Sequence, residues 1–185
     1  MRKLQSQFGF SIMELIVVIF IIGLMSTVMF ANYRQGERDT TLEYAAQGIA
    51  QDIRHAQNLS LAGTKLSDED TWGYGIRFEN NKAYFIYGDV GVTPNINYQY
   101  NSGDKKVSDS ITLPTNVEIS DFNITDIFFK PPDPITYING SSDKSTVEIK
   151  ICFTTTNKCK RITTTTAGRV EVCNLDINGD CIITP

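Results

Sequence analysis

The sequence lacks the residues and motifs by which many enzymes are recognised. His55 is the only histidine among 185 residues, and the chain contains no G-x-S-x-G, nucleotide-binding P-loop or zinc-binding H-E-x-x-H motif. His55 therefore has no partners for a catalytic or metal site, and we expect it to lie on the protein surface. The sequence predicts a protein that is not an enzyme.

Basic residues are fewer than acidic residues. The chain has 17 Lys and Arg residues against 21 Asp and Glu, which gives a formal net charge of -4. Broad binding to nucleic acid or to anionic lipid requires a basic field. Nucleic acid is therefore an unfavoured partner unless a local basic patch forms.

Cysteine is absent from the first 151 residues. The four cysteines are Cys152, Cys159, Cys173 and Cys181. Their C-x6-C and C-x7-C spacings suit neither a zinc site nor a redox C-x-x-C pair, whereas an even number in an exported domain indicates disulfides. Three pairings are possible, and we favour the two local ones, Cys152 with Cys159 and Cys173 with Cys181.

Charge is almost missing from one long segment. Residues 10–31 form a run of 22 residues in which Glu14 is the only charge. About 20 apolar residues span the hydrocarbon core of a membrane, and basic Arg2 and Lys3 before the run would retain the leader in the cytoplasm. A cleavable secretory signal is disfavoured because large side chains such as Phe30 follow the run where small ones are needed.

Glu14 requires an explanation within this apolar run. A carboxylate in a membrane helix costs about 2.5–3.5 kcal/mol on insertion scales, so it normally has a function and a partner. No Lys or Arg occurs between Lys3 and Arg34. Cleavage between Gly9 and Phe10 would create a new amino terminus four residues before Glu14 and would supply the missing cation.

The segment Gly9-Phe10-Ser11-Ile12-Met13-Glu14 resembles the type IV prepilin motif, G-F-[ST]-x-x-E followed by an apolar helix. The resemblance implies that a prepilin peptidase cuts after Gly9 and methylates Phe10. It also implies that Glu14 pairs with the terminal amine of a neighbouring subunit in a helical filament. Pairing of Glu14 with the amine of its own chain, four residues earlier, is the alternative.

The same resemblance implies a location and a set of partners. The chain would cross the bacterial inner membrane once, with its C-terminal domain outside, and would later enter an extracellular or periplasmic filament. The implied partners are other pilin or pseudopilin subunits, the prepilin peptidase, the inner-membrane assembly platform and, before assembly, membrane lipid.

The helix should continue beyond the apolar run. Leu42, Ala45, Ile49, Ile53 and Ala56 recur at three- and four-residue spacing, which predicts an apolar stripe that packs on a sheet. A break is expected at residues 62–64, where a glycine follows the helix. The expected organisation is a leader over 1–9, a transmembrane helix over 10–31, an amphipathic helix over 32–62 and a β-rich domain over 63–185.

The β-rich domain should open with a hairpin formed by residues 72–78 and 82–87. Further strands are expected over 111–113, 117–120, 124–129, 146–153, 160–165 and 169–172. The polar stretch 89–109 predicts a long surface loop. Alternation predicts core positions for the aromatic residues Tyr74, Phe78, Tyr84, Phe85, Phe128 and Phe129.

We therefore expect an α+β fold, in which a long N-terminal helix, transmembrane in its first half, packs on an antiparallel β-sheet domain. This order is similar to that of pilins. The segments that resemble the H-type pseudopilin and the FimT-type minor pilins are 49–58, 73–78, 129–132 and 166–172. The predicted function is a structural subunit, minor pilin or pseudopilin, of a type IV pilus or a type II secretion pseudopilus.

Two further candidate sites have simpler alternative interpretations. Asp176, Asn178 and Asp180 match the opening D-x-N-x-D of a calcium loop, so Ca²⁺ is an alternative to a polar turn closed by the second disulfide. A basic patch of Lys158, Lys160, Arg161 and Arg169 would support the alternative of a DNA-binding tip pilin. DNA-binding FimT-type pilins carry G-R-x-R, but Glu171 replaces the second Arg here, and a solvated strand face is the favoured interpretation.

Overall fold

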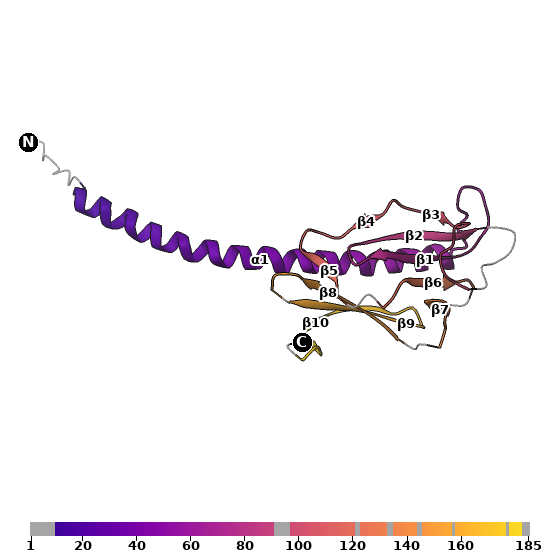
Figure 1. The fold of residues 1–185 in the computed structure, drawn as a ribbon. Coiled ribbons are helices and arrows are strands. Elements are labelled where there is room, and N and C mark those ends of the chain that lie inside the picture. Colours follow the sequence, from indigo (N-terminus) through magenta and orange to yellow (C-terminus); the bar gives the residue numbers. More distant parts are fainter. Residues whose placement is uncertain are drawn as a thin grey trace, which may run out of the picture. The chain divides into compact units, whose positions relative to one another are not determined.

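A computed structural model describes residues 10–90, 97–120, 123–132, 135–143, 146–156, 158–176 and 178–182. The side chains at 28 and 30–32 also lie outside the description, as does the expected leader over 1–9 with Gly9. The fold is α+β, as expected, and the described residues form one helix followed by eleven strands (Figure 1). The chain divides into two units, residues 1–39 and 40–185, which are described separately below.

Helix α1 runs from Ile12 to Leu61 and contains 50 residues. Ser11 begins it, because its carbonyl oxygen accepts the Leu15 N–H at 3.2 Å and its hydroxyl accepts the Met13 N–H at 3.3 Å. Gly63 ends it with a left-handed φ of 58°, a conformation that glycine adopts without a steric penalty. The expected break after the helix is confirmed.

The strands form two antiparallel sheets (Figure 1). The first has the order β3-β2-β1-β6-β7, with β4 also paired to β2, and its strands are β1 (Thr71–Asn80), β2 (Ala83–Val90), β3 (Lys105–Lys106), β4 (Ile111–Thr112), β6 (Asp126–Lys130) and β7 (Ile135–Ile138). The second has the order β11-β10-β9-β8-β5, and its strands are β5 (Val117–Ile119), β8 (Thr146–Phe153), β9 (Cys159–Thr165), β10 (Val170–Leu175) and β11 (Cys181–Ile182). The predicted hairpin is β1 paired with β2.

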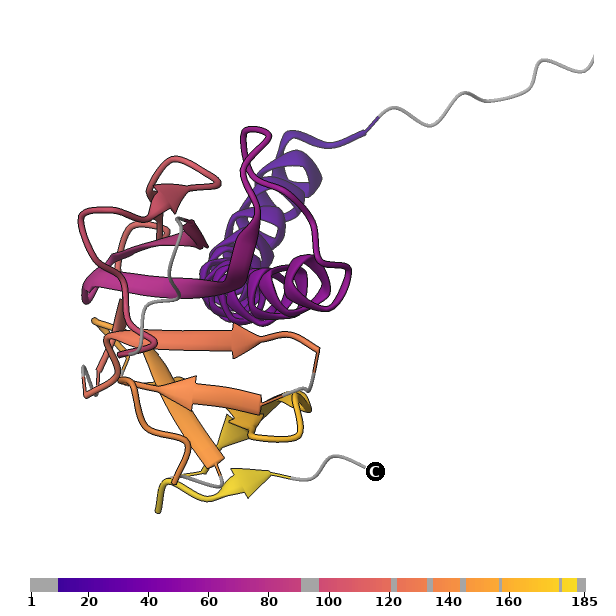
Figure 2. The ribbon, with the colours of Figure 1, turned by 90° about the vertical axis from the view of Figure 1, so that its right-hand side faces the viewer.

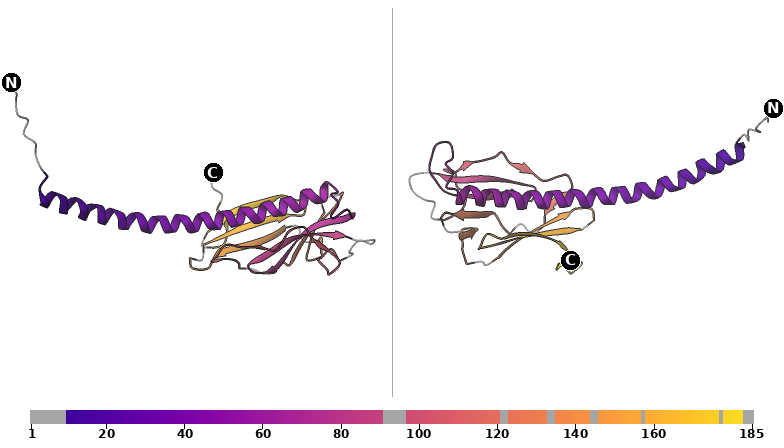
Figure 3. Two further views of the ribbon diagram at one scale, coloured as in Figure 1. Left: turned by 90° about the horizontal axis from the view of Figure 1, so that it is seen from above. Right: turned by 180° about the vertical axis from the view of Figure 1, so that it is seen from behind.

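The main core lies between the second half of α1 and both sheets (Figure 2, Figure 3). All five stripe residues of the helix are buried there, and Ile49, Ile53 and Ala56 have no exposed surface. Inward residues of the sheets, such as Ile76 on β1 and Ile162 on β9, complete this core. The predicted amphipathic stripe and its contact with a sheet are both confirmed.

A second, smaller core lies on the opposite face of the first sheet. Phe85, Tyr87 and Phe128 are buried there under Tyr98, Tyr100 and Tyr137. The Tyr100 ring packs edge-on against Phe85 and Tyr87, with ring centroids 5.0 and 5.3 Å away. The expected surface loop over 89–109 is therefore partly wrong, because residues 97–107 cover a sheet face and include strand β3. The short strands β7 and β11 were also not predicted.

Candidate functional site

The first half of α1 carries an apolar surface. Each large apolar side chain described there is at least 45% exposed. Together with Phe10, which precedes the helix, we call these residues the apolar helix surface: Ile12, Met13, Leu15, Ile16, Val17, Val18, Ile19, Phe20, Ile21, Ile22, Leu24, Met25 and Met29. Successive helical residues are about 100° apart, so the unbroken run 15–22 surrounds the helix. A helix segment that is apolar on all sides is suited to burial among other helices.

Glu14 lies in the first turn of α1, and its N–H donates to the Ser11 carbonyl oxygen at 3.0 Å. The amino end of a helix carries a partial positive charge that favours a carboxylate at this position. No ion pair to Glu14 forms among the residues that the structure describes. Phe10, the predicted new terminus, is 81% exposed.

In the part of the chain that the structure describes, no helix combines the length and the apolar character that a membrane crossing requires.

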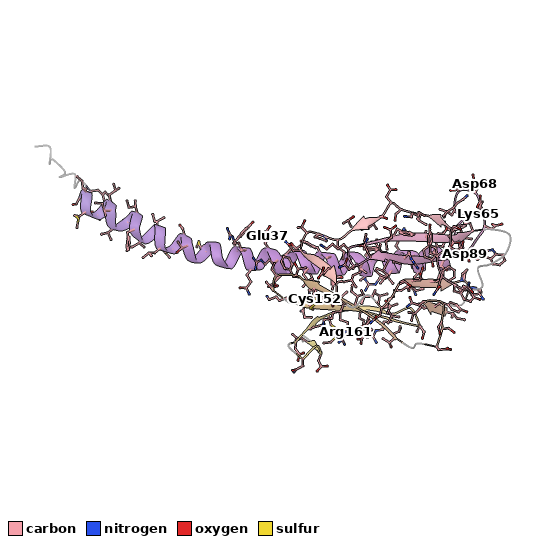
Figure 4. The ribbon with its side chains drawn as sticks, in the orientation of Figure 1. Glu37, Lys65, Asp68, Asp89, Cys152 and Arg161 are labelled. Carbon is pink, nitrogen blue, oxygen red and sulfur yellow. A yellow bond between two sulfur atoms is a disulfide. The ribbon has the colours of Figure 1, made fainter. Side chains whose placement is uncertain are left out.

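Both predicted disulfides are present. Cys152 pairs with Cys159, and Cys173 pairs with Cys181. The first links β8 to β9, where the two cysteines are direct cross-strand partners, and the second links β10 to β11. Figure 4 labels Cys152 in the second sheet. Each bridge therefore links two neighbouring strands of the second sheet.

The candidate calcium loop forms a hydrogen-bonded turn. The Asp176 Oδ1 atom accepts the N–H groups of Asn178 at 2.9 Å and Asp180 at 2.8 Å. These backbone N–H donors lower the pKa of Asp176, with the Asp180 N–H contributing most. The part of the chain that is described contains no group of three His, Cys, Asp or Glu residues placed to hold a metal ion. The geometry of the Asp176 turn is thus accounted for by its own backbone.

The structure does not bring the four candidate DNA-binding residues onto one face. Lys160 and Arg161 are consecutive on β9, so their side chains point to opposite sides of the sheet, and Lys160 is buried. Arg161, labelled in Figure 4, contacts Glu148 at 3.3 Å and the Gly179 carbonyl oxygen, and Arg169 pairs with Glu171. Lys158 is exposed and lies immediately before β9.

Lys160 belongs instead to a buried polar contact between α1 and the second sheet. Its ammonium group donates to the Glu43 carboxylate on the helix and to the Asn174 side-chain oxygen on β10. The Lys160 side chain is 9% exposed and the Glu43 side chain is 43% exposed. The hydrogen bond from Lys160 is the main cause that lowers the pKa of Glu43.

Three buried acidic residues lie beside the smaller core. Asp126 pairs with Arg77 and accepts the Tyr100 N–H at 3.0 Å. Asp104 accepts the Asn101 N–H at 2.8 Å. Burial raises the pKa of Asp104 to about 6, and the neighbouring Asp89 and Asp126 add to the rise. No local sequence pattern predicts this group, because its members, Asp89, Asp104 and Asp126, come from three separate segments of the chain.

Asp104→Asn is expected to raise the free energy of unfolding at pH 7 by about 1–2 kcal/mol, because the amide carries no charge to bury. The native pKa of about 6 lies above the ordinary value of 3.8, so the folded protein binds more protons and stability falls as pH rises from about 4 to about 6. Urea unfolding of both chains at pH 4 and pH 7 measures the difference. An equal difference at the two pH values would contradict this explanation.

A cavity of about 390 Å³ lies at one end of the first sheet, beside the acidic residues. Its lining residues are Thr71, Trp72, Asp89, Tyr98, Phe128, Lys130, Pro131 and Pro132. Trp72 is exposed at the start of β1, and Figure 4 labels Asp89 near the end of β2. No local motif marks this cavity, because its walls come from residues far apart in the chain.

His55 is exposed on α1, as expected, and the six predicted core aromatics are buried.

Comparison with known proteins identified no relative: the chain matches no protein-family model, no curated protein and no solved structure.

Proposed function

We propose that this protein is a structural subunit, a minor pilin or pseudopilin, of a filament of the type IV pilus or type II secretion kind. A prepilin peptidase removes residues 1–9, and the mature chain then begins at Phe10. Before assembly the subunit is held in the inner membrane. It joins the filament when its N-terminal helix packs against the helices of other subunits. The β-rich unit remains outside the helical core of the filament.

The observation that carries this proposal is the apolar helix surface. It combines a continuous helix with apolar side chains that surround its first half and are at least 45% exposed in the isolated chain. Burying such a surface stabilises an assembly by about 25 cal/mol for each Å² removed from water. A bundle of the same helices from many subunits buries it on all sides, whereas a single flat partner covers only one side.

The membrane stage before assembly is supported by the sequence. Residues 10–31 carry one charge in 22 positions, and basic Arg2 and Lys3 precede them. This pattern would place the N-terminus in the cytoplasm and the β-rich unit on the other side of the membrane. The two disulfides agree with such a location, because disulfides persist outside the reducing cytosol.

The position of Glu14 supports a role in register. Glu14 lies four residues after Phe10 and is the only charged residue in the run 10–31. In a bundle of identical helices, apolar contacts alone permit many axial offsets, whereas a carboxylate that must meet a cation permits few. The processed amine of Phe10 on a neighbouring subunit is the cation that this proposal assigns to it.

Mass spectrometry of the chain after co-expression with a prepilin peptidase tests the processing step. The expected product begins at Phe10, carries one N-methyl group and lacks residues 1–9. A Gly9→Val chain is the matched control, because the bulky side chain at the cleavage position should leave the leader attached. A mature terminus at any other residue would overturn the proposed function.

A further inference from the structure

We propose that Asp89 and Asp104 form a proton-operated latch, which holds residues 97–104 against the first sheet and releases them when the shared proton is lost. We call residues 97–104 the latch segment. Asp89 lies near the end of β2 (Figure 4), and Asp104 lies at the end of the latch segment, next to β3. This inference concerns the β-rich unit alone and does not depend on the filament role.

The two carboxyl groups of the latch are buried and in contact. Asp89 is 3% exposed and Asp104 is 8% exposed, and their side chains are hydrogen-bonded to each other. A carboxylate oxygen can only accept a hydrogen bond, so two carboxyl groups form one only when either of them carries a proton. Two buried carboxylates in contact would also repel each other. Closure of the latch segment therefore requires a proton between Asp89 and Asp104.

The charges around the latch favour the protonated pair. Arg77 on β1 pairs with Asp126 on β6, a third buried carboxylate beside the latch. The lysines of β3 and β6 contact other groups: Lys105 contacts Glu69 at 2.6 Å, Lys106 contacts Glu79 at 3.0 Å, and Lys130 donates to the Tyr98 hydroxyl at 3.2 Å. Burial raises the pKa of Asp104 to about 6 and outweighs the Asn101 N–H, which lowers it. The charges of Asp89 and Asp126 add to the rise.

Backbone N–H groups connect the latch segment to these carboxyl groups. The Tyr100 N–H donates to Asp126 Oδ1 at 3.0 Å, and the Asn101 N–H donates to Asp104 Oδ2 at 2.8 Å. The Asp104 N–H in turn donates to the Asn101 carbonyl oxygen at 3.1 Å. The Tyr100 ring covers two aromatic rings of the smaller core. Separation of Asp104 from its partner carboxyl group would therefore move the backbone that carries Tyr100 and uncover part of this core.

The hydroxyl of Tyr87 keeps the closed arrangement from being too stable to open. Tyr87 on β2 has no exposed surface, and its hydroxyl lies beside the Asp126 carboxylate without a hydrogen bond of good geometry to any described residue. Burial raises the pKa of Tyr87 well above its usual range, and the three buried carboxyl groups raise it further. A buried donor without an acceptor costs free energy. Opening of the latch segment would relieve this cost by admitting water.

The direction of the switch follows from the two states of Asp104. In the closed arrangement its pKa is about 6, whereas a solvated aspartate titrates near the ordinary value of 3.8. The closed arrangement therefore binds the proton more tightly, and the open population rises as pH rises from about 4 to about 6 and changes little above that range. A pKa difference of about two units limits this rise to about 100-fold.

Hydrogen–deuterium exchange of the full chain in detergent, measured by mass spectrometry, tests the latch. Exchange rates of peptides from the latch segment are measured at pH 4.5 and pH 7 and divided by the intrinsic exchange rate at each pH. We expect the protection of the latch segment to fall about tenfold or more between the two pH values, while the protection of β8 and β9 changes much less. Equal protection of the latch segment at both pH values, or an equal loss in β8 and β9, would overturn the proposal.

Three variants identify the carboxyl groups that carry the proton. Asp104→Asn should leave the latch segment protected at both pH values, because its amide donates to Asp89 without titrating. Asp89→Asn should reduce the change with pH, since the amide supplies a donor to the ionised Asp104. Asp109→Asn is the matched control, because it neutralises an exposed carboxyl group in the same polar stretch, and it should retain the change seen in the parent chain.

The variants also define the results that would contradict the latch. A tenfold loss of protection that persists in Asp104→Asn would show that another group titrates. An unchanged loss in Asp89→Asn would contradict the shared proton. Abolition of the loss in Asp109→Asn would mean that the overall charge of the stretch, and not the buried pair, controls the latch segment.

Discussion

Glu14→Ala is expected to reduce filament assembly about 100-fold or more while the chain remains in the membrane. In the proposed filament the carboxylate pairs with the amine of Phe10 on a neighbouring subunit. Removing one partner of a buried ion pair costs about 3–5 kcal/mol, and 1.4 kcal/mol corresponds to a factor of ten. Membrane insertion should persist, because alanine removes the cost of a carboxylate in an apolar helix. Immunoblots of sheared filaments and of membrane fractions measure the two quantities.

Glu37→Ala is the matched control for this prediction. Glu37 lies on the same helix and carries the same charge, but it lies after the apolar run and is exposed (Figure 4). Assembly of this control should stay close to that of the parent chain. Normal amounts of sheared filament from Glu14→Ala would contradict the pairing role. Loss of the chain from the membrane fraction would contradict the claim that insertion does not need Glu14.

Regular spacing explains why much of the β-rich unit and its helix could be predicted. The stripe from Leu42 to Ala56 repeats with the helical period, and the aromatic residues of β1 and β2 alternate with the strand period. Strand β8 was predicted at its observed bounds, 146–153, and the local disulfides join strands that are neighbours in the sequence. These features depend on short-range patterns, which the sequence contains directly.

The packing of segment 97–107 on the smaller core could not be predicted in the same way. Segment 97–107 is rich in Asn, Ser, Gly and charged residues, which is typical of a surface loop. Its position instead follows from two tyrosines, Tyr98 and Tyr100, which reach aromatic residues of β2, β6 and β7. Such contacts join residues more than ten positions apart, and no spacing rule encodes them. The neighbouring cavity depends on the same long-range arrangement.

The position of Lys160 could have been found from the sequence. On a strand, Lys160, Ile162 and Thr164 share one face, and Ile162 is the residue most expected in a core. The structure places all three on the buried face of β9. Because of this alternation, Lys160 and Arg161 cannot belong to one basic patch. The positive charge of Lys160 therefore serves the contact with the helix and contributes nothing to an open basic surface.

Glu43→Gln is expected to lower the free energy of unfolding by about 2–3 kcal/mol at pH 7. The substitution leaves the Lys160 ammonium buried, 9% exposed, with a neutral amide in place of its carboxylate. Asn174 still accepts one hydrogen bond, which keeps the loss below that of a fully orphaned charge. Urea unfolding of the full chain in detergent, followed by near-ultraviolet circular dichroism, measures the change.

Lys160→Met should be much milder, with a loss below about 1 kcal/mol. Methionine keeps the apolar stem of the lysine, and the freed Glu43 carboxylate, 43% exposed, can be solvated by water. The two variants break the same ion pair, so equal losses would show that the pair, and not the burial of one partner, determines stability.

The pH dependence of the stability loss in Glu43→Gln distinguishes an effect of the Glu43 charge from an effect of altered packing. The pKa of Glu43 is lowered in the folded protein, so its contribution is present above about 4.5 and is lost as pH falls through the lowered native value. The deficit of Glu43→Gln relative to the parent chain should therefore be largest near pH 7 and should shrink below pH 4.5. A deficit that stays constant down to pH 3 would mean that the glutamine disturbs packing of the helix, and that the charge on Glu43 contributes little to holding α1 against the second sheet.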